Sequence, residues 1–451
     1  MKNFFITSLL LILSVIYVGV RIYHFHNTPT TLTNDTDTYI ETAKLAITEP
    51  EFWNGIRPVT MPFLIKIFNF NWNLLVTFQF TVSVAAWLLL AFMLSKTIEL
   101  PAIKIFSLGF LLLFSLSTDI VLWDRIVQTE SLNLSIWATL VSIFLARING
   151  AFKTPTFLVF LIIMLWAFLR DTNAWLLLFL AAIATGYLIL SRAHLKQYLK
   201  PAFLIVLFML SNFSANAGNR WVVPFLNVLS VRILPREDYL KEFEVRGMPI
   251  TLTLMEQEGI TFSEEYINNP ELENFSKWLL SNGKNSYMKF LLRHPAYLVQ
   301  APFENWTLLF GFLPDHQGTR NDNLDYAPEN FKEIIPYPWA EILYPKEFGL
   351  ATVLVSLIIT GLILSQENLL KKEPIFAFIL ALLLSSYPML ILNYHGDASG
   401  IARHALAIIL QIILASWFFI LIYLDKFLNK QALPSIKNIT PSNEHQEVIA
   451  Q

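Results

Sequence analysis

Long apolar runs with few charges most constrain what this chain can fold into. An α-helix needs about 20 apolar residues to cross the hydrocarbon core of a bilayer, and it satisfies its own backbone hydrogen bonds there. We count ten such runs, to within about one, at residues 4–20, 73–95, 102–118, 127–146, 156–169, 174–191, 201–217, 348–365, 374–393 and 404–424. The expected fold class is an all-α polytopic membrane protein with about ten transmembrane helices.

The composition agrees with a bilayer as the solvent. Hydrophobic residues make up 55% of the chain and charged residues only 15%, and the charged residues lie between the apolar runs. The formal net charge of −2 argues against a nucleic-acid partner, because phosphate backbones bind to basic surfaces. The absence of cysteine excludes disulfides, thiolate nucleophiles and cysteine-ligated metal centres.

Lysine and arginine in the short loops predict the orientation of the helices, because these residues are enriched on the cytoplasmic side. With the N-terminus in the cytoplasm, the opposite short loops carry little beyond Arg125, Arg170 and Arg403. The cytoplasmic segments then hold most of the loop cations: Lys96, Lys104, Arg147, Lys153, Arg192, Lys196, Lys200, Lys371, Lys372, Lys426 and Lys430. We therefore expect a multi-pass plasma-membrane protein with both termini in the cytoplasm.

The first apolar run follows Lys2 and has two readings, a signal peptide or a span. Its length, the lack of a small-residue cleavage site and its continuation into Tyr17, Arg21 and Tyr23 favour an uncleaved span that ends in an interfacial anchor.

The pattern divides the chain into four parts. Residues 1–217 form an N-terminal transmembrane module whose first outside loop, 21–72, contains a short helical segment. Residues 218–347 mix aromatic and charged side chains and form an extracytoplasmic, mostly helical cap on the membrane; the cap is either a cover without chemistry or a lid that binds an acceptor. Residues 348–424 are the C-terminal transmembrane helices, and the tail 425–451, without apolar periodicity, is predicted to be disordered.

Two carboxylates stand at the start of the helical segment in the first outside loop. Asp35 and Asp37 precede Tyr39, and Arg57 follows in an Arg-Pro-Val-Thr-Met-Pro stretch. An Asp at such a position caps free backbone N–H groups, which explains one of the two. The alternatives are a general base or a ligand to a divalent cation.

The second outside turn carries three charged residues. Asp124 and Arg125 are interpreted as a solvated interfacial pair. Glu130 lies at or just inside the outer end of the fourth run, where a carboxylate is costly, so that we expect it to face a wet cavity or a partner.

The remaining outside turns add cations and histidines. The third holds Arg170 and Asp171; the last holds His395 and Asp397, and then Arg403 and His404 at the start of the final run. Arg403 either extends to the interface or binds phosphate, which suits its guanidinium geometry. The two histidines are nine residues apart, which is not a recognised metal-ligand spacing. The predicted topology brings all these polar residues to one side of the membrane.

This pattern resembles the GT-C superfamily of membrane glycosyltransferases, which includes protein O-mannosyltransferases and the aminoarabinose transferases of lipid A. The resemblance rests on Asp35 with Tyr39, Arg57 with Pro58 and Pro62, the Thr-Glu-Ser-Leu stretch at 129–132, the Arg-Asp-Thr-Asn turn at 170–173 and the late Arg-His pair at 403–404. It covers most of the first 220 residues and the last span. The chain departs from the family in its cap and in its smaller number of spans, which leaves the acceptor open.

The resemblance implies transfer of a sugar, with inversion, from a polyprenyl-phosphate donor to an extracytoplasmic glycan, lipid or protein acceptor in the cell envelope. Asp35 would be the general base, with Asp37 as its fallback, and Glu130 would line the same cavity. Arg403, with His404 or Arg170, would hold the departing lipid phosphate. The further expected substrate-binding residues are Tyr39, Arg57, Asp171, His395 and Asp397. Some members use a divalent metal such as Mg or Mn and others do not, and the sequence leaves this choice open.

Two other functions remain as alternatives. A polysaccharide polymerase or ligase would also use lipid-linked glycans, with its essential Arg and His in a late outside loop. A transporter or flippase would carry polar residues near the bilayer midplane, for which Asn212, Asn216 and Asn219 are the best candidates.

Overall fold

The computed structural model describes residues 2–152, 154–261, 266, 269–311, 331–336, 338–366, 370 and 372–437. The regular elements in these ranges are all helical, and an isolated bridge pairs Thr31 with Ile126. The all-α fold class is therefore confirmed for the described part of the chain.

Seven helices of the described residues are long and apolar enough to cross a membrane. They are α1 (Lys2–Asn27), α5 (Trp72–Thr97), α8 (Glu130–Ile148), α10 (Asp171–Leu190), α11 (Leu199–Ala217) with the 3-10 turn η2 (Leu195–Tyr198) before it, α23 (Pro374–Gly396) and α24 (Ile401–Lys437). This architecture is that of a multi-pass membrane protein.

Three of the ten apolar runs do not form long straight helices. The run at 102–118 forms α6 (Pro101–Phe114), which is bent by 59° against α7 (Thr118–Val121) and η1 (Leu122–Arg125) and counts as an eighth span when the bent pair is taken as one. The runs at 156–169 and 348–365 form the shorter helices α9 (Thr156–Ala167) and α21 (Gly349–Ser365). The count of ten spans is therefore not confirmed.

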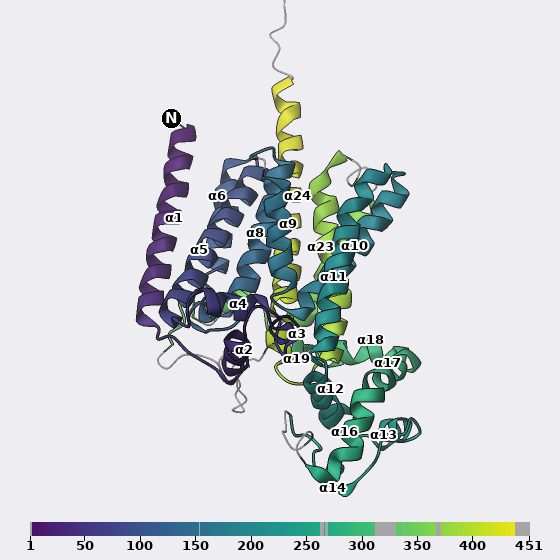
Figure 1. The fold of residues 1–451 in the computed structure, drawn as a ribbon. Coiled ribbons are helices and arrows are strands. Elements are labelled where there is room, and N and C mark those ends of the chain that lie inside the picture. Colours follow the sequence, from purple (N-terminus) through teal and green to yellow (C-terminus); the bar gives the residue numbers. More distant parts are fainter. Residues whose placement is uncertain are drawn as a thin grey trace, which may run out of the picture.

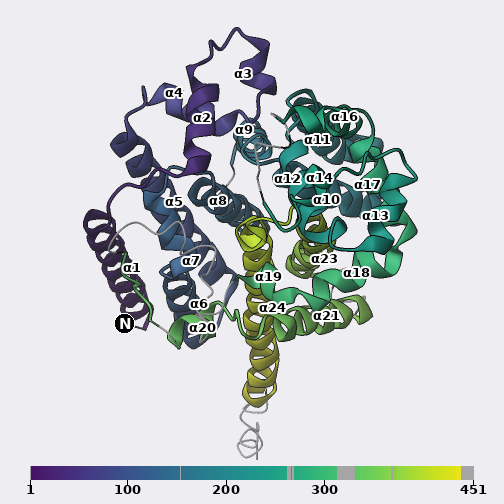
Figure 2. The same cartoon turned by 90° about the horizontal axis from the view of Figure 1, so that it is seen from below.

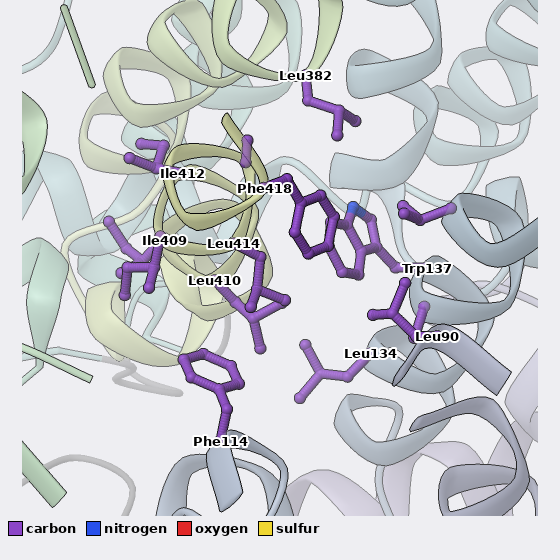
Figure 3. Packing of buried hydrophobic residues seen from close by; sticks show 14 of the residues in the cluster. Leu90, Phe114, Leu134, Trp137, Leu382, Ile409, Leu410, Ile412, Leu414 and Phe418 are labelled. Carbon is purple, nitrogen blue, oxygen red and sulfur yellow. The ribbon is translucent and has the colours of Figure 1, made fainter. Parts of the chain in front are cut away.

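The last span, α24, lies in the centre of the bundle. Of its most apolar stretch, 83% is buried inside the protein, compared with 17% for α1, which lies at the rim (Figure 2). A helix that is apolar on all sides suits such a buried position. Figure 3 shows Leu410, Leu414 and Phe418 of α24 packed among side chains of α5, α6, α8 and α23. These contacts hold the axis of α24 in place.

Polar contacts fix the position of α24 along its axis. Gln411 accepts a hydrogen bond from Trp137 Nε1 (2.8 Å) and donates to the carbonyl of Leu382 (2.9 Å). Near the other end, Asp425 accepts from the backbone N–H groups of Glu99 (3.1 Å) and Leu100 (2.8 Å), just before α6. These anchors prevent sliding of the helix.

The helix α24 also extends beyond the predicted final span. It continues to Lys437, so residues 425–437 are helical where disorder was expected, and that prediction is wrong for them. The anchored Asp425 and the ion pair of Lys426 with Glu373 (2.8 Å) explain the continuation, since tertiary contacts stabilise a segment without apolar periodicity. Residues 438–451 lie outside the described part of the chain.

The loop 21–72 contains three short helices, α2 (Asn34–Lys44), α3 (Pro50–Asn54) and α4 (Thr60–Ile67). Thr33 precedes α2, and its backbone N–H donates to the hydroxyl of Thr36 (2.9 Å). Threonines thus cap this helix and leave the carboxylates of its first turn available for other contacts.

The regular elements described in the 218–347 segment are all helical. Its elements are α12 (Val222–Val228), the π-helical turn η3 (Leu229–Ile233), α13 (Glu237–Glu244), α14 (Leu252–Met255), η4 (Pro270–Leu272), α16 (Glu273–Trp278), the π-helical turn η5 (Leu279–Gly283), α17 (Lys284–Arg293), α18 (Pro295–Glu304), α19 (Trp306–Phe310) and α20 (Trp339–Leu343). An aromatic core that includes Phe243, Tyr266, Phe275 and Phe290 supports it. Figure 1 shows this segment at the same end of the bundle as α2 and α3.

A buried ion pair joins α1 to the bent segment. The Arg21 side chain, 1% exposed, pairs with Asp124 and donates to Ser83 Oγ (2.8 Å) and to the Ser115 carbonyl (2.9 Å). Arg125, by contrast, lies over the ring of Phe25 at 4.3 Å. The interpretations of Arg21 as an interfacial anchor and of Asp124 with Arg125 as a solvated pair are therefore wrong. The bend after α6 turns Asp124 into the bundle, toward the arginine of α1.

Replacing Arg21 with methionine should destabilise the protein strongly, because the Asp124 carboxylate would remain buried without its cation. Breaking a buried ion pair from one side costs about 3–5 kcal/mol. Thermal unfolding of the purified protein in nanodiscs measures this loss. The matched control is Arg21→Met combined with Asp124→Asn, which should recover much of the stability. Equal losses in the two variants would contradict the assignment.

Candidate functional site

The loop 21–72 and the last span meet at Asp35. Its Oδ1 accepts a hydrogen bond from Arg57 Nη2 (2.5 Å), and its Oδ2 accepts one from Arg403 Nη1 (2.5 Å). Arg57 also donates through Nε to Thr38 Oγ1 (2.5 Å) and lies 4.9 Å from the centre of the buried Tyr39 ring. One carboxylate therefore bridges two guanidinium groups that come from distant parts of the chain.

A glycine turn and a glutamine position Arg403. Gly400 precedes α24 with φ of +57°, a backbone conformation that L side chains rarely adopt. The place of a Cβ lies 3.7 Å from Arg403 Nε, an ordinary van der Waals distance, so the backbone conformation rather than crowding favours glycine there. Arg403 Nη1 donates to Gln128 Oε1 (3.0 Å), and Gln128 in turn donates to Thr33 Oγ1 (2.5 Å). The Gly400 turn before α24 and the Gln128 contact with Thr33 before α2 thus both hold Arg403 near Asp35.

Glu130 and Arg170 form a second ion pair next to that of Asp35 and Arg403. Glu130, at the start of α8, accepts from Arg170 Nη1 (2.9 Å), and its Oε1 lies 3.9 Å from Arg403 Nε. Arg170 Nη2 lies 2.9 Å from His404 Nδ1. The Glu130 side chain is only 3% exposed, as expected for an acid that needs a partner at that depth. Arg170, in the turn between α9 and α10, supplies that partner.

Asp397 links His404 to the 218–347 segment. Its Oδ2 lies 3.6 Å from His404 Nε2, and its Oδ1 accepts from Asn227 Nδ2 (2.9 Å). Arg232 donates to the carbonyl oxygens of Tyr394 (2.5 Å) and Asp397 (3.3 Å). The cluster around Asp35, as we call it below, comprises Asp35, Arg57, Gln128, Glu130, Arg170, Asp397, Arg403 and His404.

Two carboxylates of the cluster, Asp35 and Asp397, lie outside the spanning helices, and their pKa values are shifted in opposite directions. Burial alone would raise the pKa of Asp35, but the charges of Arg403 and Arg57 outweigh it and hold the pKa well below its usual range. Burial raises the pKa of Asp397, against the hydrogen bonds from the Ser399 N–H and from Asn227. Asp35 is therefore the carboxylate that stays ionised at low pH.

Three of the predicted site residues lie apart from this cluster. Asp37 is exposed and makes no ion pair with the described residues. Asp171 binds Arg220 through both carboxylate oxygens, at 2.9 and 3.0 Å. His395 places Nε2 3.0 Å from the Leu298 carbonyl. Its ring contacts aromatic side chains on two sides, Tyr297 and Tyr394.

Sequence reasoning missed Gln128, Asn227, Arg220 and Arg232 among the residues that contact the predicted site. Gln128 had a signal, since it lies two residues before Glu130 in the polar stretch that opens an apolar run. The other three lie at the end of a span or within the 218–347 segment, where polar residues are frequent and no periodicity singles them out.

The donors available to a divalent metal are few. Among the described residues, no group of three or more His, Asp and Glu side chains is arranged to hold a metal ion. Asp35 and Glu130, the acids that the resemblance would offer, each contact arginine. We therefore derive no step through a metal.

Comparison with known proteins adds no relative to this description. The sequence matches no protein-family model, and no curated protein matches it.

Replacing Arg170 with methionine should cost about 3–5 kcal/mol of stability, because Glu130 would stay buried with only a distant contact to Arg403. Arg57→Met is the matched control. It removes a cation from Asp35, whose side chain is 24% exposed and keeps Arg403, so the loss should be about 1 kcal/mol or less. Thermal unfolding in nanodiscs compares the two. A larger loss of stability for Arg57→Met than for Arg170→Met would show that burial does not determine how much each ion pair contributes to stability.

Proposed function

We propose that this protein is an integral membrane glycosyltransferase, which transfers a sugar from a polyprenyl-phosphate donor to an extracytoplasmic glycan, lipid or protein acceptor. The observation that carries the proposal is the double contact of Asp35 with Arg57 and Arg403. Asp35 and Arg57 are about one-quarter exposed and Arg403 is 11% exposed, so that a reachable proton acceptor lies between two groups suited to phosphate.

The proposed reaction is a displacement at the anomeric carbon. The acceptor hydroxyl gives its proton to Asp35 while its oxygen forms the new bond to that carbon. The bond between the anomeric carbon and the phosphate oxygen breaks, and its electron pair leaves with the lipid phosphate. Attack opposite to the leaving group inverts the configuration. Negative charge grows on the phosphate during this step, where cations stabilise it most.

The resting ion pairs suggest how the donor prepares the base. A donor phosphate competes with Asp35 for the Arg403 guanidinium, because both are anions that accept from the same N–H groups. Binding of the donor at Arg403 thus frees Asp35 Oδ2 for the acceptor hydroxyl. Arg57 remains on Oδ1 and keeps the carboxylate oriented.

The residues behind Asp35 take a positioning role in this proposal. Glu130 holds Arg170, and Arg170 contacts His404, which lies one residue after Arg403 on α24. The three side chains thereby keep the start of α24 facing α2. Because Glu130 is almost fully buried, it is assigned no proton transfer.

The proposed topology places this end of the bundle outside the plasma membrane. With α6, α9 and α21 also crossing the bilayer, ten spans bring both termini to the cytoplasm, which agrees with the enrichment of loop lysines and arginines on that side. The donor then enters from the outer leaflet.

Asp35→Asn should reduce sugar transfer at least 100-fold, in line with the usual contribution of a general base. Donor binding should stay equal or become tighter, because the neutral amide competes less for Arg403. Transfer of radiolabelled sugar from a panel of polyprenyl-phosphate sugars, with the protein in nanodiscs, measures turnover. Binding of the donor that reacts is measured alongside.

The matched control is Asp37→Asn, which removes a charge from the same helical turn at an exposed position and should leave transfer near wild type. An active Asp35→Asn variant would exclude the proposed base. Parallel losses of donor binding and turnover would indicate a structural role. Absence of turnover with every donor would favour a polymerase, a ligase or a transporter.

The pH dependence of transfer should change when Arg57 is replaced by glutamine. In the wild type, the pKa of Asp35 is held below its usual range, so kcat/KM should lack an acid limb from this group above about pH 4. Removing a nearby cation raises a carboxyl pKa by roughly 1–3 units, and the acid limb should move to higher pH.

A pH series of kcat/KM for both proteins measures this shift. Arg220→Gln is the control, because Arg220 contacts Asp171 rather than Asp35, and its profile should match the wild type. Identical acid limbs in the wild type and in Arg57→Gln would show that Arg57 does not set the ionisation of the base.

A further inference from the structure

A polar groove opens between α13 and α17 in the 218–347 segment. It has a volume of about 550 Å³ and is lined by Lys241, Glu242, Val245, Arg246, Asn282, Asn285, Ser286, Lys289 and Arg293. Four of these side chains are cationic and one is acidic. The groove shares no residue with the cluster around Asp35.

The cations of the groove differ in their partners. Arg246 pairs with Glu242 (3.1 Å), which also contacts His294, and Lys241 pairs with Glu237 (2.8 Å). Lys289 and Arg293 are exposed and make no ion pair within the described residues. The α17 wall of the groove therefore carries uncompensated positive charge, with the amide side chains of Asn282 and Asn285 beside it.

The groove lies close to the outer ends of the spans. His294 joins α17 directly to α18, and α18 packs on the end of α23, where the Leu298 carbonyl contacts His395 (3.0 Å). Figures 1 and 2 show α17 and α18 beside the bundle end and α13 with α17 at the periphery. Ligands that reside at a membrane surface can reach this position.

Helix α17 carries two exposed stripes side by side. Lys289 and Arg293 are four residues apart and form the cationic stripe, and Met288 and Leu292 form an apolar one with the same spacing. Leu292 is 73% exposed. A helix with neighbouring cationic and apolar stripes is typical of binding to the interface of an anionic membrane.

We propose that this groove binds the phosphate of an anionic phospholipid headgroup. Lys289 and Arg293 contact the phosphate, Asn282 and Asn285 donate to the headgroup, and the exposed apolar stripe lies against the acyl-chain boundary. Guanidinium and ammonium groups suit phosphate oxygens. Because α17 and α18 lie next to the end of the helix bundle, a lipid headgroup is favoured over a soluble anion. The site is independent of sugar transfer and needs no turnover for its test.

The test uses purified full-length protein in detergent, titrated with short-chain phosphatidylglycerol or with phosphatidylcholine of the same chain length. Native mass spectrometry counts the bound lipid. The wild type should prefer the anionic lipid, and the double variant Lys289→Gln/Arg293→Gln should bind it about twenty-five-fold more weakly, because each cation near the surface contributes about fivefold.

The matched control is Lys277→Gln/Lys332→Gln, which removes the same charge from the 218–347 segment outside the groove and should bind like the wild type. Thermal unfolding checks that both double variants are folded. Unchanged lipid binding in the groove variant, or an equal loss in the control, would overturn the proposal. Inorganic phosphate forms a third arm; if it occupies the groove as tightly as the lipid, the site recognises a soluble anion instead.

Discussion

The contact between Arg403 and Asp35 is the interaction on which the arrangement of the site depends, since it joins positions 368 residues apart. It requires that α24 keep one register along its axis. Gln411 and Asp425, both on α24, bind fixed partners in other helices and provide that register. A rigid helix with anchors at two depths can hold its first turn within hydrogen-bond distance of a loop helix, and the loop is itself held by a buried cluster in which Tyr39 and Met61 pack with residues of α5 and α8.

Burial distinguishes the ion pairs that hold the bundle together from those that can exchange partners. Arg21 with Asp124, and Arg170 with Glu130, are nearly inaccessible, so that separating them would leave a charge without solvent. The pair of Arg57 with Asp35 is about one-quarter exposed on both sides, and water can replace either partner at low cost. A ligand anion can therefore reach the cluster through the exposed sides of Asp35 and Arg57, next to Arg403, which is itself 11% exposed, whereas the Glu130 carboxylate is only 3% exposed.

Much of the cluster was predictable because polar residues at the ends of apolar runs must meet at the membrane surface. This rule predicts that Asp35, Glu130, Arg170 and Arg403 lie together, and they do. The same rule failed for Arg21 and Asp124. A charged residue at the end of an apolar run gives the same sequence pattern whether its helix end faces water or packs against a neighbouring helix. The bend after α6, which decides between these cases, has no signal in hydropathy. The runs at 156–169 and 348–365 predict the bounds of α9 and α21 to within two residues, but both helices are shorter than the seven long apolar ones.

The proposed base illustrates why the resting structure and the reacting one must differ. A carboxylate between two guanidinium groups is ionised but weakly basic, since its lowered pKa measures how poorly it accepts a proton. If the donor phosphate removes only Arg403, the remaining contact with Arg57 keeps Asp35 ionised, while the loss of one cation raises its basicity. Basicity then develops only after the donor is bound. The same ion pair that organises the site would thus suppress proton abstraction until the leaving group is in place.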